Sequence, residues 1–237
     1  MNIALLIAGG VGNRMHQEIP KQFLNVYDKP VIVYTLEAFQ KHPNIDAIEV
    51  VCLDGWHEIL WAYCRQFGIT KLENIVSGGK NGQDSIRNGL IDLRKRHDDD
   101  TIVLIHDAIR PMVSADIISD NIHICEKYGN AITVIPCAEA MLKTDNSIDS
   151  TEQVQRDNLK RTQTPQSFRL GEILSIHKDA LSRGITNSVA SCTLYIEMGR
   201  KVFFSVGSEK NIKLTTVDDL DIFKALLKSK RADWIVD

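Results

Sequence analysis

The chain has 237 residues, 43% hydrophobic and 25% charged, a composition that fits an ordinary globular protein and excludes a disordered or fibrous one. Its 28 Lys and Arg against 31 Asp and Glu give a net charge of −3, so it lacks the broad positive field of a nucleic-acid or anionic-membrane binder. Any anion must therefore be bound by a few positioned groups. We expect residues 1–237 to form one domain, since α/β domains of this length are common.

The composition of the first segment and the cysteine pattern narrow the class further. The apolar run at 3–8 is too short to cross a bilayer and has no cationic segment before it, so we expect a cytoplasmic protein without a membrane anchor. The five cysteines form no C-x-x-C pair, and the seven histidines show no H-E-x-x-H spacing. These spacings argue against a disulfide framework and against a zinc site.

Up to about residue 136, apolar β-branched runs alternate with segments of helical period. In chain order the pattern predicts strand 3–8, helix 31–42, strand 47–53, helix 56–67, strand 74–77, helix 85–97, strand 102–105, helix 115–128 and strand 131–136. Strands that are apolar at nearly every position need helices on both faces, so we predict an α/β fold with a doubly wound, mostly parallel sheet. Ligands of such folds bind at the carboxyl ends of the strands.

The alternation breaks between residue 137 and about residue 163. This stretch is polar, with short extended pieces near Lys143 and Val154, and reads as a small β-excursion. A disordered loop is one interpretation and a partner-contacting arm is the other. We expect the arm, because long polar insertions in compact domains are usually functional.

After the excursion the pattern predicts helix 170–182, a second helix at 191–198, strand 202–206 and a last helix. Thr216 and Asp219 stand in capping-box spacing at the start of that last helix. Its apolar face should pack as a lid on the sheet.

The strongest chemical signal follows the first strand, where the chain reads A-G-G-V-G-N-R-M over residues 8–15. Glycines there let backbone N–H groups approach a phosphate chain closely, although a tight turn would also need them. Two cations in the same segment favour a nucleoside triphosphate, whose charge must be neutralised as it grows in the transition state. We expect catalytic roles for Arg14 and Lys21, and nucleotide contacts from Ile7, Ala8, Gly9, Gly10, Gly12 and Asn13.

The pattern A-G-G-x-G-x-R-M followed by P-K-Q-F at 20–23 resembles the cytidylyltransferases that act on sugar and polyol phosphates. Three further landmarks occur in order: H-D-A-I-R-P at 106–111, Q-T-P-Q-S-F at 163–168 and N-I-K-L-T-T at 211–216. The resemblance covers nearly the whole chain. It implies a Rossmann-like nucleotidyltransferase fold, CTP as co-substrate, Mg²⁺ as cofactor and a homodimer.

The resemblance gives roles to two nucleotide-side landmarks. Asp107, directly after a buried strand, would hold Mg²⁺ against the triphosphate, where the alternative is an aspartate that forms a turn. In the second glycine-rich loop, Gly79, Asn81 and Ser85 would contact the cytosine; without the resemblance this is a loop with an N-cap.

The resemblance also gives roles on the acceptor side. Arg156 and Lys213 would bind the acceptor phosphate, with Arg156 arriving on the 137–163 arm of the neighbouring subunit. Arg110 would lie near the nucleotide or the acceptor, and Thr164 would also bind substrate. Without the resemblance, Arg156 and Lys213 would read as exposed cations.

Departures from the family pattern bear on the acceptor. The chain has Gly82 where members usually carry Arg. It has Glu139-Ala140 where the erythritol-phosphate branch has a Thr, V-A-S-C at 189–192 where that branch has T-D-[DE]-[AS], and Lys210 where it has an acid. These changes favour D-ribitol 5-phosphate, for a teichoic-acid or capsule polymer, over 2-C-methyl-D-erythritol 4-phosphate, the isoprenoid precursor. A nucleotide-binding module without catalysis is the alternative from another class.

Overall fold

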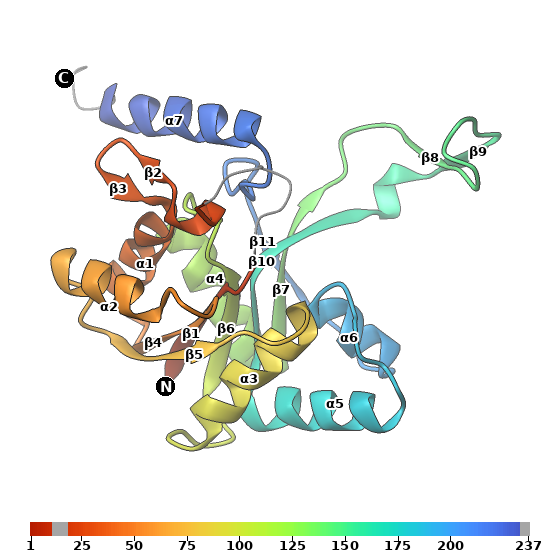
Figure 1. Cartoon of the computed structure of the whole chain (residues 1–237). Coiled ribbons are helices and arrows are strands. Elements are labelled where there is room, and N and C mark those ends of the chain that lie inside the picture. The colour runs from red at the N-terminus through yellow and green to blue at the C-terminus, as the bar shows by residue number, and fades with distance from the viewer. Residues whose placement is uncertain (11–18, 233–237) are drawn as a thin grey trace.

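The computed structural model describes residues 1–10 and 19–232, with side chains described up to residue 229. A central seven-stranded sheet has the order β11-β7-β10-β6-β1-β4-β5 (Figure 1). Neighbouring strands are parallel except at β10, which runs antiparallel to both β6 and β7. The predicted doubly wound, mostly parallel sheet is thereby confirmed. Its strands are β1 (Asn2–Ala8), β4 (Ala47–Cys52), β5 (Leu72–Ser77), β6 (Ile102–Asp107), β7 (Asn130–Pro136), β10 (Lys160–Arg169) and β11 (Phe204–Val206).

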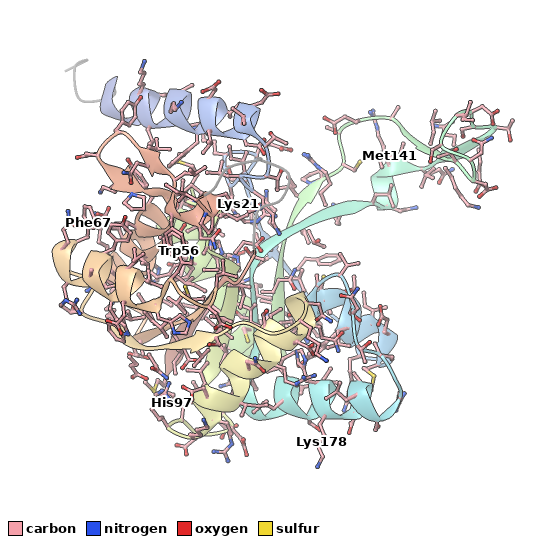
Figure 2. All side chains as sticks on the ribbon, in the orientation of Figure 1. Lys21, Trp56, Phe67, His97, Met141 and Lys178 are labelled. Carbon is pink, nitrogen blue, oxygen red and sulfur yellow. The ribbon has the colours of Figure 1, made fainter. Side chains whose placement is uncertain are left out.

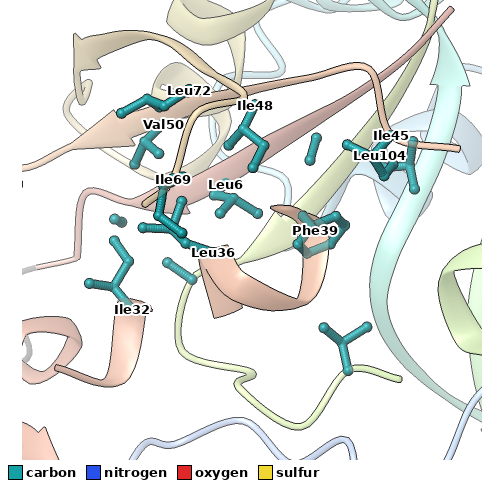
Figure 3. Packing of buried hydrophobic residues seen from close by; sticks show 14 of the residues in the cluster. Leu6, Ile32, Leu36, Phe39, Ile45, Ile48, Val50, Ile69, Leu72 and Leu104 are labelled. Atoms are coloured by element: carbon teal, nitrogen blue, oxygen red, sulfur yellow. The ribbon is translucent and has the colours of Figure 1, made fainter. Parts of the chain in front are cut away.

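Helices cover both faces of the sheet because each buried strand sends alternate side chains to opposite sides. Leu6 of β1 packs with the helices on one face, and its neighbour Leu5 packs with those on the other. Figure 3 shows the first face, where Leu36 and Phe39 lie against Leu6 and Ile48. The first face is covered by α1 (Val31–Lys41), α2 (His57–Gln66) and α4 (Ala115–Tyr128), and the second by α3 (Gly82–Arg94), α5 (Leu170–Ser182) and α6 (Ser191–Glu197).

Side-chain caps set the start of the helices nearest the carboxyl edge of the sheet. The Asn81 side chain accepts a hydrogen bond from Asp84 N at 2.9 Å, so α3 begins at Gly82 and not at the predicted Ser85. The predicted capping box of the last helix, α7 (Val217–Ala232), is present, with Thr216 N donating to Asp219 at 2.8 Å and Asp219 N to Thr216 at 3.3 Å.

The apolar pattern predicted that the last helix packs as a lid on the sheet, and this prediction is wrong. Phe223 of α7 is fully buried against Val26, Val31 and Met112. The helix therefore covers the small hairpin of β2 (Asn25–Val26) and β3 (Lys29–Pro30) and the first turn of α1. No helix within residues 1–10 and 19–232 is long and apolar enough to cross a membrane.

The polar excursion forms a projecting hairpin of β8 (Met141–Lys143) and β9 (Glu152–Val154), which extends away from the body in Figure 1. It carries a short 3₁₀ turn, η3 (Arg156–Asn158), before the chain enters β10. The expected extended pieces near Lys143 and Val154 are thus confirmed, and a contact of this hairpin with a partner stays a prediction.

Candidate active site

A cleft of about 640 Å³ opens at the carboxyl ends of the central strands. It is lined by the ends of β1 and β6, the loop before α3, part of β10 and the segment before α7. Figure 2 labels Lys21, which belongs to the 3₁₀ turn η2 (Lys21–Phe23) beside this edge of the sheet. The predicted location at the carboxyl ends follows from the parallel sheet, which leaves its crevice there.

The cleft collects most of the residues predicted from the sequence. Arg156 lies apart from it on the projecting hairpin, where its guanidinium donates to the Ala138 carbonyl. Gly12, Asn13 and Arg14 lie outside the described residues. The predicted residues that line the cleft are Ile7, Ala8, Gly9, Gly10, Lys21, Gly79, Asn81, Ser85, Asp107, Arg110, Thr164 and Lys213.

The loop before α3 is folded around the hydroxyl of Ser85. Ser85 Oγ accepts from Gly79 N at 3.0 Å and donates to the Asn81 carbonyl at 2.8 Å. A Cβ at Gly79 would lie 2.3 Å from the Asp84 side chain, so this close approach requires glycine. Because the single hydroxyl proton is used, Ser85 can offer a ligand only an oxygen lone pair.

Gln22 holds the first glycine loop and was missed by the sequence reasoning. Its side chain is 1% exposed, and its amide donates to the carbonyls of Ala8 at 2.7 Å and Gly10 at 3.1 Å. It stands in the P-K-Q-F run, which was the signal available for it.

Asp107 is the electrostatic centre of the cleft. Its carboxylate accepts from Arg110 Nε at 3.0 Å and from Lys213 Nζ at 3.1 Å, although Lys213 is 106 residues away in the chain. Burial on its own would raise the pKa of Asp107, but the Lys213 ammonium and the Arg110 guanidinium outweigh it and hold the pKa below its usual value. Asp107 is therefore ionised at neutral pH.

Thr164 of β10 contacts both residues at the carboxyl end of β6, His106 and Asp107. Its hydroxyl oxygen accepts from Asp107 N at 3.1 Å and lies 3.0 Å from His106 Nδ1. Burial lowers the pKa of His106 to about 4, so the imidazole that contacts the Thr164 hydroxyl is neutral near pH 7.

Gln163 fastens the segment that presents Lys213, and sequence reasoning gave it no role. Its amide donates to the Ser208 carbonyl at 2.9 Å, and its carbonyl oxygen accepts from Ser208 N and Asn211 Nδ2, both at 3.3 Å. Arg110 holds the same segment through the Asn211 carbonyl at 2.8 Å. Lys213 thus projects from a braced loop.

Asp107 can hold a metal ion only together with a bound substrate that supplies further oxygen ligands to the same ion. Across the described parts of the chain, no three His, Cys, Asp or Glu residues come together as a metal site. Asp107 retains lone pairs beside its two hydrogen bonds. Mg²⁺ commonly takes one or two carboxylates and completes its shell with water and substrate phosphates, so Asp107 suits that arrangement.

Comparison with known proteins bears on this geometry. Residues 2–229 match the family model "IspD: 2-C-methyl-D-erythritol 4-phosphate cytidylyltransferase". The chain is 43% identical to a ribitol-5-phosphate cytidylyltransferase of Lacticaseibacillus paracasei, covering 97% of this chain and 99% of that protein. It is 42% identical to one of Vibrio parahaemolyticus, with 97% of each covered. A 2-C-methyl-D-erythritol 4-phosphate cytidylyltransferase of Clostridium botulinum is 37% identical over 96% of this chain and 97% of its own length.

Solved structures share the fold. The 4-diphosphocytidyl-2C-methyl-D-erythritol synthase of Anaerococcus prevotii superposes with a TM-score of 0.81 at 24% identity, with 96% of both chains covered. The 2-C-methyl-D-erythritol 4-phosphate cytidylyltransferase of Francisella tularensis gives 0.78 at 25% identity, covering 95% of this chain and 99% of its own.

Proposed function

The chain belongs to the IspD family of cytidylyltransferases, CTP-dependent nucleotidyltransferases, and we propose that it transfers cytidine monophosphate from CTP to D-ribitol 5-phosphate. The products are CDP-ribitol and pyrophosphate. The preference for ribitol over methylerythritol phosphate rests on the names of the relatives, which are 42–43% identical for the first and 37% for the second.

One structural observation carries the proposal: four sequence-distant motifs line one cleft. The glycine loop, the Asp107 turn, the Thr164 segment and the Lys213 loop come from β1, β6, β10 and the approach to α7. The cleft combines glycine backbone with the cations Lys21, Arg110 and Lys213, which suits a nucleotide and a phosphorylated acceptor.

The proposed reaction is a direct displacement. An oxygen of the acceptor phosphate attacks the α-phosphorus of CTP, the new phosphorus–oxygen bond forms, and the bond to the β-phosphate oxygen breaks with its electron pair leaving on pyrophosphate. The attacking oxygen is already anionic, so the protein needs to position the groups and stabilise charge, not to form a covalent intermediate. We assign charge stabilisation to Lys21 and Arg14.

We propose that Asp107 carries Mg²⁺ together with the triphosphate. A bound Mg²⁺ would offset negative charge on the triphosphate oxygens. Lys213 and Arg110 hold the Asp107 carboxylate ionised and fixed, so the ligand is already organised when substrate arrives. We propose that the same two cations also bind the acceptor phosphate.

We further propose a single domain that works as a homodimer, with residues 137–163 as the arm and Arg156 reaching the neighbour's acceptor. Leu142 is 66% exposed and Ile148 is 88% exposed at the end of the arm, which favours cover by a second surface. The cytoplasmic location and the use of the product in a teichoic-acid or capsule polymer stay predictions.

The deciding experiment measures pyrophosphate release with CTP and either ribitol 5-phosphate or 2-C-methyl-D-erythritol 4-phosphate. We expect ribitol 5-phosphate to give the higher kcat/KM, and excess EDTA to abolish release until Mg²⁺ is restored. A higher kcat/KM with 2-C-methyl-D-erythritol 4-phosphate would assign the chain to the methylerythritol-phosphate branch of the family. The non-catalytic alternative would show CTP binding without release with either acceptor.

A further inference from the structure

One end of the cleft lies where α3, α5 and α6 meet, close together in the lower part of Figure 1. Its wall contains the apolar side chains of Ile86 from α3 and Leu194 from α6. Two polar side chains interrupt that wall, His177 from α5 and Ser191 from the first turn of α6. We call this part of the cleft the α5–α6 recess. Lys178, labelled in Figure 2, points outward from α5, whereas His177 is turned inward.

Both polar side chains of the recess are buried without a partner. His177 is 1% exposed and Ser191 is 4% exposed. Within the described residues, the two ring nitrogens of His177 and the hydroxyl of Ser191 make no hydrogen bond. Buried polar atoms without partners cost free energy and are rare in folded proteins, so two of them lining one cleft point to a ligand that supplies the missing bonds.

The chemistry of the recess selects uncharged hydroxyl groups. Burial, and next the nearby Arg87, lowers the pKa of His177 to about 4, which leaves the imidazole neutral near pH 7. A neutral imidazole offers one donor and one acceptor, and a serine hydroxyl offers both as well. These groups match an alcohol, which also donates and accepts, better than a phosphate, for which the cleft has Lys21, Arg110 and Lys213.

The recess is held in place from both sides. Gln83 of α3 accepts from Ser188 N at 2.7 Å and donates to the Ile185 carbonyl at 2.9 Å. Gln166 of β10, two residues beyond Thr164, accepts from Cys192 N at 3.0 Å. The segment that carries Ser191 is therefore fastened to the predicted acceptor strand, and its hydroxyl is presented from a fixed backbone.

We propose that His177 and Ser191 bind hydroxyl groups along the polyol chain of the acceptor and so help to set its specificity. The inference rests on the proposed function, because it gives the acceptor of that reaction its partners. It adds two specificity residues to the cations that bind the phosphate end.

The experiment compares wild type with His177→Leu, His177→Asn and Ser191→Ala, and uses Ser182→Ala, an exposed serine of α5, as the matched control. We expect His177→Leu and Ser191→Ala each to raise KM for ribitol 5-phosphate roughly fivefold, the loss of one neutral hydrogen bond. KM and the dissociation constant for CTP should stay within about twofold, and His177→Asn should recover part of the loss. The melting temperatures of His177→Leu and Ser191→Ala should be unchanged or higher, because these two variants no longer bury an unpartnered polar group.

Several results would overturn the inference. A rise in KM for CTP with an unchanged acceptor KM would assign the recess to the cytosine or ribose. Unchanged values for both substrates would mean that it holds water only. If His177→Leu does not fold, the smaller Ser191→Ala change decides. Failure of the proposed function is seen separately, as wild-type protein that releases no pyrophosphate with ribitol 5-phosphate, and it would remove the inference as well.

Discussion

Replacing Asp107 with asparagine removes the charge that Arg110 and Lys213 share while keeping the size of the side chain. The contact to Arg110 is largely buried, since that guanidinium is 12% exposed, and a hydrogen bond between charged groups contributes about 1.5–3 kcal/mol. Lys213 is 43% exposed, so its contact is screened by solvent and contributes at most about 1 kcal/mol. Asparagine keeps a weaker acceptor, so we expect a net loss of roughly 2 kcal/mol.

For a chain of this size, that loss corresponds to a fall in Tm of about 4–8 °C. Asp221→Asn is the matched control, because Asp221 makes a similar 3.0 Å contact to Lys224 but is 71% exposed. The Asp221→Asn change should lower the free energy of unfolding by less than about 0.5 kcal/mol. We expect kcat/KM of Asp107→Asn to fall at least about a hundredfold, since the proposed Mg²⁺ ligand is weakened.

The pH dependence of the same variant gives an independent check. The folded pKa of Asp107 lies below its unfolded value, near 3.9, so its contribution to stability is present above that value and is lost as pH falls through the folded pKa. The difference in urea midpoint between wild type and Asp107→Asn should therefore narrow below about pH 4. A variant with wild-type Tm at pH 7, or a difference that does not change with pH, would refute the reasoning.

Three further predictions follow from the described residues. Lys21→Ala should lower kcat by about two to four orders of magnitude with an unchanged circular dichroism spectrum, and near-normal turnover would remove its assigned role. Glu49 of β4 pairs with Arg96, and burial raises the pKa of Glu49 to about 8. The folded state therefore keeps a proton that the unfolded state releases, and stability falls as pH rises from about 5 to 8; urea midpoints of Glu49→Gln should vary less over that range. Replacing Leu142 and Ile148 with serine should shift the protein towards monomer in sedimentation, whereas an unchanged mass would argue against the arm as the interface.

The strands that sequence could predict are those buried by apolar side chains. The run I-V-L-I at 102–105 predicts β6, because a short run that is apolar on both faces is typical of a strand covered by helices on both sides. β10 was missed because its sequence, K-R-T-Q-T-P-Q-S-F-R, has no apolar run and has Pro165 at its centre, where the register with β7 shifts. Its interior is paired by hydrogen bonds instead: Asn121 accepts from Ser167 Oγ and donates to the Pro165 carbonyl.

The candidate site divides in the same way. Asp107 and Lys213 were found because they stand in recognisable motifs, but their mutual contact depends on a turn of chain 106 residues away. Gln163 and His177 were missed because only the fold brings their neighbours to them, the 208–211 segment to Gln163 and helices α3 and α6 to His177. The misplacement of α7 has a related cause, since an amphipathic pattern shows that one face is buried and does not say against what.

The hairpin of β8 and β9 joins the body where Lys160 of β10 pairs with Pro136 of β7. Within the described strands, β8 and β9 pair with each other and stand apart from the seven-stranded sheet. Insertions, deletions or exchanges within residues 141–154 would therefore leave the sheet, its cleft and Arg156 in place. Over evolutionary time the sequence of this segment can change together with the surface that it contacts, while the residues of the cleft are constrained by the chemistry there.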